Sequence, residues 1–300
     1  MPKAAANGIE LEYETFGDPG HPPILLIMGL ASQLIHWPEP FCERLAQAGY
    51  YVIRFDNRDI GLSTRLSGQG KVKLMRQAIK AALGLRVRAP YLLEDMAQDA
   101  LGLLDALKIE SAHIVGASMG GMIGQILAAK HPQRVKSFVC WMSSSGNPLL
   151  RGPSLKIRLR LVSRPSKLDR ESLIQHSMQT WRLIGSPRFP TDPGTLRARI
   201  ERAFDRAHYP PGLARQTLAI IASPSRVPLL KKIKAPTLVL HGQDDALVPV
   251  AAAHDLAKHI PGARLEIIRG YGHDLPAQLL PRLAELVLEH LRSAALRQAA

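Results

Sequence analysis

Residues 116–120 read Gly-Ala-Ser-Met-Gly, and this stretch decides how the rest of the sequence is interpreted. It follows an apolar run at 112–115 and leads into small and apolar residues that continue to 129. Glycines on both sides of Ser118 permit backbone angles that a Cβ atom would forbid, so the serine can stand at the apex of a strained turn. A serine hydroxyl becomes a useful nucleophile above a helix N-terminus, beside backbone N–H groups. The stretch therefore predicts a nucleophilic serine between a buried strand and a helix.

Length and composition limit the class of protein. The chain has 300 residues, 46% of them hydrophobic, so it can bury a large core as one domain or as one domain with an insertion. No apolar stretch approaches the roughly 18 residues of a transmembrane helix, and the first residues lack the apolar segment of a secretory signal. Cys42 and Cys140 are far apart in sequence and indicate neither a disulfide framework nor a metal site. We therefore expect a cytoplasmic protein.

The net charge of +14 is concentrated in two segments. Residues 61–90 contain seven Lys and Arg and no acidic residue, and residues 151–230 contain fifteen Lys and Arg against five acidic residues. These segments form either a solvated basic surface or a face that makes weak contact with anionic substrates or anionic surfaces. Nucleic acid is not an expected partner, because aromatic residues make up 5% of the chain and no zinc-finger spacing or helix-turn-helix pattern occurs.

Strand patterns alternate with helix patterns along most of the chain, which predicts βαβ units and a mostly parallel sheet. The predicted strands cover residues 9–14, 22–28, 51–55, 112–115, 138–142, 235–240 and 264–268. The predicted helices cover residues 39–48, 92–107, a stretch that ends at 129, residues 251–259, and a closing helix with Leu283, Leu286, Val287 and Leu291 on one face.

This alternation stops near residue 143 and resumes at residue 235. Residues 147–226 are rich in Arg and Pro and contain no convincing buried strand. Residues 155–161 alternate with period two, which by itself favours a strand, but their neighbours have helical patterns and we interpret the stretch as helical. The sequence thus predicts a core of residues 1–146 and 227–300 with a helical cap at 147–226.

A nucleophilic serine needs a base that takes its proton and a carboxylate that orients that base. In sheets of this kind, ligand sites lie beyond the carboxyl ends of the strands. Asp244 and Asp245 follow the strand that ends at 240, and His273 follows the strand that ends at 268. The chain order Ser118, Asp245, His273 is the Ser…Asp…His order associated with a nucleophile elbow.

Taken together, these motifs resemble the α/β-hydrolase family, and the resemblance covers nearly the whole chain. It implies a mostly parallel central sheet flanked by helices, with an inserted helical cap. Residues 28–31 and 55–63 look most like the small capped esterases related to aclacinomycin methylesterase. The resemblance is carried by Met-Gly-Leu at 28–30, by residues 56–63, by the elbow at 116–120, by Gly-Gln-Asp-Asp at 242–245 and by Gly-His at 272–273.

The resemblance also implies the role of each candidate side chain. Ser118 corresponds to the nucleophile and His273 to the general base and acid. Asp245 corresponds to the orienting carboxylate, because this family usually places its acid three residues after the glycine at 242; Asp244 is the competing choice.

Two backbone N–H groups, those of Leu30 and Met119, correspond to the oxyanion hole, which binds the charge that develops on the carbonyl oxygen. This chain has Met-Gly at 28–29, where a His-Gly pair is common in the family. A backbone donor at Leu30 does not need that histidine, so the departure bears on substrate range rather than on the chemistry.

We predict a serine hydrolase that cleaves a carboxylic ester of a small molecule through an acyl-enzyme, without a metal or an organic cofactor. A thioesterase, a lactonase, a carbon–carbon bond hydrolase or a cofactor-free perhydrolase would use the same residues and stays open. An epoxide hydrolase or haloalkane dehalogenase would carry an aspartate in place of Ser118. A non-catalytic ligand-binding protein of the same fold is the second hypothesis, which the intact Ser118, Asp245 and His273 disfavour. The oligomeric state is left open.

Three other positions carry weaker expectations. His36 and Trp37 follow the predicted oxyanion loop and are candidates for the pocket lining. Arg58 lies between two aspartates and is interpreted as a structural ion-pair residue. His241 is expected to pack or cap near the end of its strand.

Overall fold

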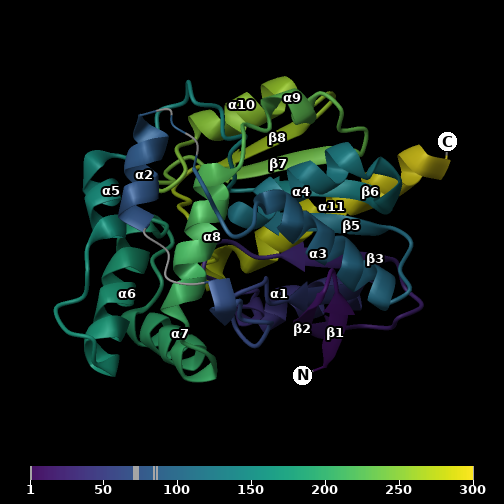
Figure 1. Cartoon of the computed structure of the whole chain (residues 1–300). Coiled ribbons are helices and arrows are strands. Elements are labelled where there is room, and N and C mark those ends of the chain that lie inside the picture. Colours follow the sequence, from purple (N-terminus) through teal and green to yellow (C-terminus); the bar gives the residue numbers. More distant parts are fainter. Residues whose placement is uncertain (1, 70–73, 84, 86, 300) are drawn as a thin grey trace.

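The computed structural model describes residues 2–69, 74–83, 85 and 87–299, which form a central eight-stranded sheet with helices around it (Figure 1). The strand order is β1-β2-β4-β3-β5-β6-β7-β8; β2 pairs antiparallel with both of its neighbours and the other pairs are parallel. The predicted α/β-hydrolase fold is confirmed. The strands are β1 (Lys3–Ala6), β2 (Ile9–Phe16), β3 (Pro23–Ile27), β4 (Tyr51–Phe55), β5 (Ala112–Ala117), β6 (Val135–Trp141), β7 (Thr237–Gly242) and β8 (Arg264–Ile268).

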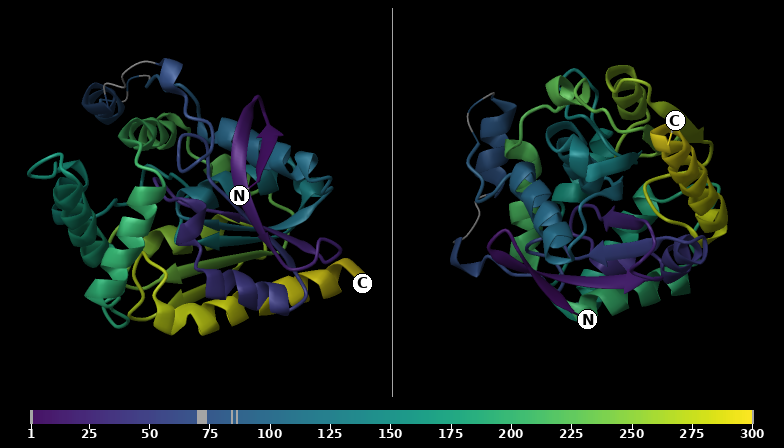
Figure 2. Two further views of the ribbon diagram at one scale, coloured as in Figure 1. Left: turned by 90° about the horizontal axis from the view of Figure 1, so that it is seen from below. Right: turned by 90° about the vertical axis from the view of Figure 1, so that its right-hand side faces the viewer.

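Helices cover both faces of this sheet. They are α1 (Glu39–Gln47), α3 (Leu93–Ala106), α4 (Met119–Lys130), α10 (Ala251–His259) and α11 (Leu280–Ala299). Side chains of β3 alternate between two buried cores, as expected for a strand covered on both faces. Leu25 and Ile27 join the core that contains α3, α4 and α10, whereas Ile24 and Leu26 join the core that contains α1 and α11. Figure 2 shows α1 and α11 together on one side of the strands.

Several observed elements have no counterpart in the sequence predictions, among them β1, α2 and the short helix α9 (Val227–Leu230). The strand β1 is an alanine-rich edge strand, and alanine has low β-propensity; pairing with β2 and close packing on α3 hold it in place. A Cβ atom on Gly102 of α3 would lie 3.0 Å from the Ala6 Cα. The helix α2 (Leu74–Ala82) lies in the basic segment 61–90, for which the sequence analysis predicts no helix.

The closing helix is confirmed as α11. Leu283, Val287 and Leu291 are fully buried against the sheet, and Leu286 is partly buried. Within the part of the chain that the structure describes, no helix is both long and apolar enough to cross a membrane.

We call residues 147–226 the helical insertion. It contains α5 (Leu155–Val162), α6 (Arg170–Ile184), α7 (Pro193–Arg206) and α8 (Pro210–Ala222), and α5, α6 and α7 gather at one end of the molecule (Figure 1). The stretch 155–161 is helical, as interpreted from its neighbours: Ile157 is buried and the Ser154 side chain caps the helix N-terminus. The helices α6 and α7 share a small core of their own, formed by Ile174, Met178, Leu196 and Ile200.

Two buried histidines predict that the fold loses stability in acid. Burial lowers the pKa of His113 and of His290 from 6.5 to about 4. The unfolded chain therefore takes up these protons first, so the free energy of unfolding falls as the pH drops from about 6.5 to about 4. Each histidine accounts for roughly 2 kcal/mol at a pH of about 5. Urea unfolding at neutral pH and at about pH 5 measures the loss.

Buried carboxyl groups act in the opposite direction, because burial raises the pKa of Asp56 and of Asp99. The variant His113→Gln separates the two effects. It should lose less stability between the two pH values than the unmodified chain, by roughly 2 kcal/mol. Equal losses in both proteins would contradict this account of His113.

Candidate active site

Ser118 stands at the turn between β5 and α4 with φ 55° and ψ −118°. A positive φ is uncommon for a residue with a side chain, and at a strand-to-helix turn this strain exposes the hydroxyl. The sequence analysis expected the flanking glycines to supply the unusual backbone angles of this turn. In the structure, Ser118 itself has the positive φ. A Cβ atom on Gly116 would lie 2.3 Å from the Gly120 oxygen, and one on Gly120 would lie 1.9 Å from the Ile27 oxygen. The glycines are thus required for close approach of backbone to backbone.

The three side chains predicted for the triad lie in one line of polar contacts. Ser118 Oγ is 3.0 Å from His273 Nε2, and His273 Nδ1 is 2.6 Å from Asp245 Oδ2. The other carboxylate oxygen of Asp245 accepts the backbone N–H groups of Leu247 (2.9 Å) and Val248 (2.7 Å). These bonds fix the carboxylate, so the imidazole ring is held with one nitrogen toward the serine. The arrangement can pass a proton from the hydroxyl to the ring.

The neighbouring carboxylate makes a different contact. Asp244 Oδ2 accepts the backbone N–H of Gly270 at 2.7 Å and so ties the loop after β7 to the loop after β8. His241 packs at the end of β7 as expected, with Nε2 2.8 Å from the Val248 oxygen. Its Nε2 also lies 3.5 Å from Asp245 Oδ2. Among the described contacts, Asp245 is the carboxylate that reaches His273.

The two residues predicted to supply the oxyanion donors belong to segments that border Ser118. Met119 is the first residue of α4, directly after Ser118. Leu30 follows Gly29, and Gly29 lies against the serine: a Cβ atom on it would be 3.0 Å from the Ser118 Cβ and 3.6 Å from Ser118 Oγ. A side chain at position 29 would therefore press against the serine side chain where this loop approaches it.

The loop around Leu30 is held from two sides. From the core, Asn57 Nδ2 donates to the Met28 oxygen at 3.0 Å. From the helical insertion, Gln216 Oε1 on α8 accepts the backbone N–H of Ala31 at 3.0 Å. Ala31 has φ 59°, a conformation that needs support from its surroundings. Sequence reasoning missed Gln216, because no local pattern marks a glutamine that contacts a loop 185 residues away.

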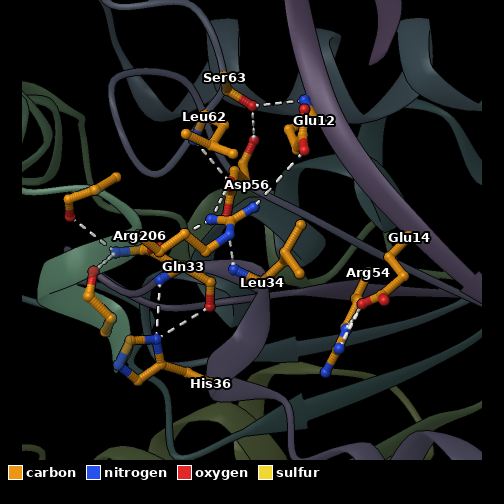
Figure 3. A network of polar contacts seen from close by, with 12 residues as sticks. Glu12, Glu14, Gln33, Leu34, His36, Arg54, Asp56, Leu62, Ser63 and Arg206 are labelled. Atoms are coloured by element: carbon orange, nitrogen blue, oxygen red, sulfur yellow. Dashed lines mark hydrogen bonds and ion pairs between the residues drawn. The ribbon is translucent and has the colours of Figure 1, made fainter. Parts of the chain in front are cut away.

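A buried carboxylate next to this loop joins three segments of the chain (Figure 3). Asp56 Oδ1 accepts the backbone N–H of Leu34 at 2.7 Å, and Asp56 Oδ2 accepts that of Leu62 at 2.9 Å. Arg206, at the end of α7, donates to Asp56 Oδ2 at 2.7 Å and to Gln33 Oε1 at 2.8 Å. Burial raises the pKa of Asp56, and the guanidinium of Arg206 opposes that shift. The helical insertion is thereby attached to the segment that follows the predicted oxyanion loop.

The weaker expectations have mixed outcomes. Arg58 is a structural ion-pair residue, and its partner is Asp99, with Nε 2.5 Å from Oδ2. His36 is half-buried and stacks on Trp181 of α6, with ring centroids 6.2 Å apart. Trp37 is fully buried in the core that contains α1 and α11.

The chain belongs to the α/β-hydrolase family, whose alpha/beta hydrolase fold matches residues 22–277. It is 32% identical to rhodomycin D methylesterase DauP of Streptomyces sp. (strain C5), over 95% of this chain and 96% of that protein. It is 30% identical to rhodomycin D methylesterase DnrP of Streptomyces peucetius, again over 95% and 96% of the two chains. The resemblance inferred from the loops is confirmed, and these relatives support esterase activity of the α/β-hydrolase type.

Solved structures show the same fold in enzymes of other reaction classes. A meta-cleavage product hydrolase from Pseudomonas fluorescens IP01 superposes with a TM-score of 0.77 at 21% identity, covering 98% of both chains. An enol-lactonase from Burkholderia xenovorans LB400 superposes with a TM-score of 0.73 at 24% identity, covering 97% of this chain and 100% of that one. At these identities the likeness concerns the fold alone.

Removing Arg206 should destabilise the protein strongly. The variant Arg206→Met leaves the carboxylate of Asp56 buried without this cation, which is expected to lower the free energy of unfolding by about 3 kcal/mol. Chemical denaturation measures the change.

The matched control is Arg202→Met, which removes the same charge from the same helix. Arg202 is exposed and pairs with Glu39 at 2.7 Å, so its loss should change stability by less than about 1 kcal/mol. Equal effects of the two substitutions would show that Asp56 does not depend on Arg206.

Proposed function

We propose that Ser118, His273 and Asp245 form the catalytic triad of a carboxylic ester hydrolase. The proposal rests on the 3.0 Å separation between Ser118 Oγ and His273 Nε2. In this mechanism the serine oxygen attacks the ester carbonyl carbon while His273 takes the hydroxyl proton, and Asp245 orients the ring and balances its positive charge. The alcohol leaves with the proton from His273. Water, activated by the same histidine, then releases the acid from the acyl-enzyme.

In the same proposal, the backbone N–H groups of Leu30 and Met119 donate to the carbonyl oxygen as it becomes negative. Preorganised donors of this kind are often the largest single term in acyl transfer. The position of Met119 at the N-terminus of α4 supports this role, because the helix dipole favours negative charge there. The reaction as proposed uses no metal ion and no organic cofactor.

We propose a methyl ester of a small organic molecule as the substrate, because the two relatives named above are methylesterases. Lactone hydrolysis and carbon–carbon bond hydrolysis are the alternative reactions, since an enol-lactonase and a meta-cleavage product hydrolase share the fold. Turnover measured over a panel of methyl esters, lactones, thioesters and vinylogous diketones would separate these activities.

We infer that the helical insertion acts as a cap on a core of residues 1–146 and 227–300. Contacts from Gln216 and Arg206 to the segment beside Ser118 support this assignment.

The basic segments 61–90 and 151–230 are proposed to make weak contact with anionic surfaces, which cosedimentation with phosphatidylglycerol vesicles would test; nucleic acid is not a proposed partner. A cytoplasmic location is proposed from the two buried free cysteines, and cell fractionation would test it.

Replacing the proposed nucleophile should abolish turnover. Ser118→Ala is expected to lower kcat for a methyl ester at least about a thousandfold, because the variant lacks the hydroxyl that forms the acyl-enzyme. Its circular dichroism spectrum and thermal midpoint should stay close to those of the unmodified chain. A fluorophosphonate probe should label the unmodified chain at Ser118. Nearly unchanged turnover by the alanine variant would contradict the proposal, and no turnover by either protein would favour a ligand-binding role.

The two adjacent carboxylates should differ in their effect on the reaction. Asp245→Asn is expected to lower kcat by up to about ten-thousandfold, because an amide favours the wrong tautomer of the histidine. Asp244→Asn changes the same charge one residue away and should affect kcat far less, since Asp244 contacts the Gly270 backbone. A larger loss in Asp244→Asn would show that the acid had been assigned to the wrong residue.

A further inference from the structure

A cavity of about 320 Å³ lies where α6 and α7 meet the loops after β7 and β8. Its wall includes Asp244 and Asp274, the chain neighbours of Asp245 and His273. The cavity therefore adjoins both loops that carry the proposed acid and base. From the helical insertion, Trp181, Thr191, Leu196 and Arg199 also contribute to the lining.

Arg199 differs from the other arginines near it on α7. Arg197 pairs with Glu171 at 2.6 Å, and Arg202 pairs with Glu39 at 2.7 Å. Among the described contacts, Arg199 has no hydrogen bond and no ion pair; its guanidinium carbon lies 5.2 Å from the centre of the Trp181 ring. Arg199 is half-buried. Burial lowers the pKa of its guanidinium, and the negative charge of the nearby Asp274 opposes this shift.

The acidic groups of the cavity wall make their direct hydrogen bonds to groups other than Arg199, and Asp274 acts on Arg199 only through its charge. Asp274 Oδ1 accepts the Ser186 hydroxyl at 2.5 Å, and Asp244 Oδ2 accepts the Gly270 backbone N–H at 2.7 Å. Both bonds stay within the loops that build the wall. The lining also contains a buried polar group without a hydrogen-bond partner among the described residues: the hydroxyl oxygen Oγ1 of Thr191.

A cation that is partly removed from water and makes no direct hydrogen bond or ion pair is incompletely compensated, and an anion that binds beside it lowers that cost. The guanidinium presents parallel donors that match the two oxygens of a carboxylate. The volume is at the lower end for ligand pockets, so it suits one arm of a molecule better than a whole extended ligand. The aromatic face of Trp181 offers apolar contact to the same arm.

We propose that Arg199 binds a carboxylate group of the substrate, so that the preferred esters are half-esters that carry a free carboxylate apart from the ester bond. This inference rests on the proposed ester hydrolysis at Ser118. It locates anion preference in one side chain, whereas the charge of the segment 151–230 as a whole would act on any anion at long range.

Methanol release from two matched series tests the proposal: monomethyl esters of dicarboxylic acids, and methyl esters of monocarboxylic acids of the same chain length. The readout is the ratio of kcat/KM between the charged and the neutral ester. Arg199→Gln should lower this ratio by about tenfold or more, mainly through KM for the charged ester, as expected for a lost charge-assisted bond. Arg199→Lys should restore part of it, because the charge returns without the paired donors.

Arg202→Gln is the control, since it removes one charge from an exposed, paired position on the same helix. It should leave the ratio unchanged. The proposal is overturned if Arg199→Gln keeps the ratio of the unmodified chain, or if Arg202→Gln lowers it equally. The second result would mean that the general field of the basic segment attracts the anion.

Binding without turnover separates this proposal from the proposed reaction. Calorimetric titration of Ser118→Ala with a monomethyl dicarboxylate should give binding that is lost in Ser118→Ala combined with Arg199→Gln. Equal binding by both variants would overturn the role of Arg199 whatever the chemistry at Ser118. If Ser118→Ala still turned over the ester, the proposed triad would fail, and the binding comparison with Arg199→Gln would still decide the role of the cavity.

Discussion

The close approach of β3, β5 and α4 is the steric constraint on which the site depends. A Cβ atom on Gly120 would lie 1.9 Å from the Ile27 oxygen, so α4 can begin where it does only if that position has no side chain. This contact brings the end of β3 beside the turn and holds Ser118 at a positive φ. The strain at one residue is maintained by packing around it, as is usual for strained positions. A local clash in this turn would displace the nucleophile and the Leu30 loop together.

Buried ion pairs set the second constraint, because they attach the helical insertion to the core at fixed points. Arg206 reaches Asp56, and Arg215 reaches Asp59 with Nη2 2.7 Å from Oδ1. Pairs like these cost desolvation, so their net contribution to stability is small, whereas breaking one is expensive. We therefore interpret these ion pairs as contacts that select one position of α7 and α8 relative to the core. Gln216 extends the same attachment to the backbone at Ala31.

The sequence was informative wherever the relevant signal was local. The elbow around Ser118, the loop with Asp245 and the loop with His273 each follow a recognisable strand, and parallel strands bring such loops to one edge. The contacts of Arg206 and Gln216 could not be predicted, since their partners lie 150 and 185 residues away and both residue types are common on helix surfaces. The edge strand β1 could not be predicted for a similar reason: its strand conformation depends on its pairing with β2 and not on its own residues.

Charge is the property for which sequence and structure give the most different accounts. Counted along the chain, residues 151–230 are one basic block. In three dimensions, Arg197 and Arg202 pair with carboxylates at the surface, where water and salt screen them within about 8 Å. Arg206 is neutralised by a buried carboxylate. Arg199 lines the cavity beside α6 and makes no ion pair among the contacts that the structure describes, and in that less polar environment a contact with an anion is stronger than on the surface. Specific recognition of an anion therefore depends on where one cation is buried, and the net charge of the segment says little about it.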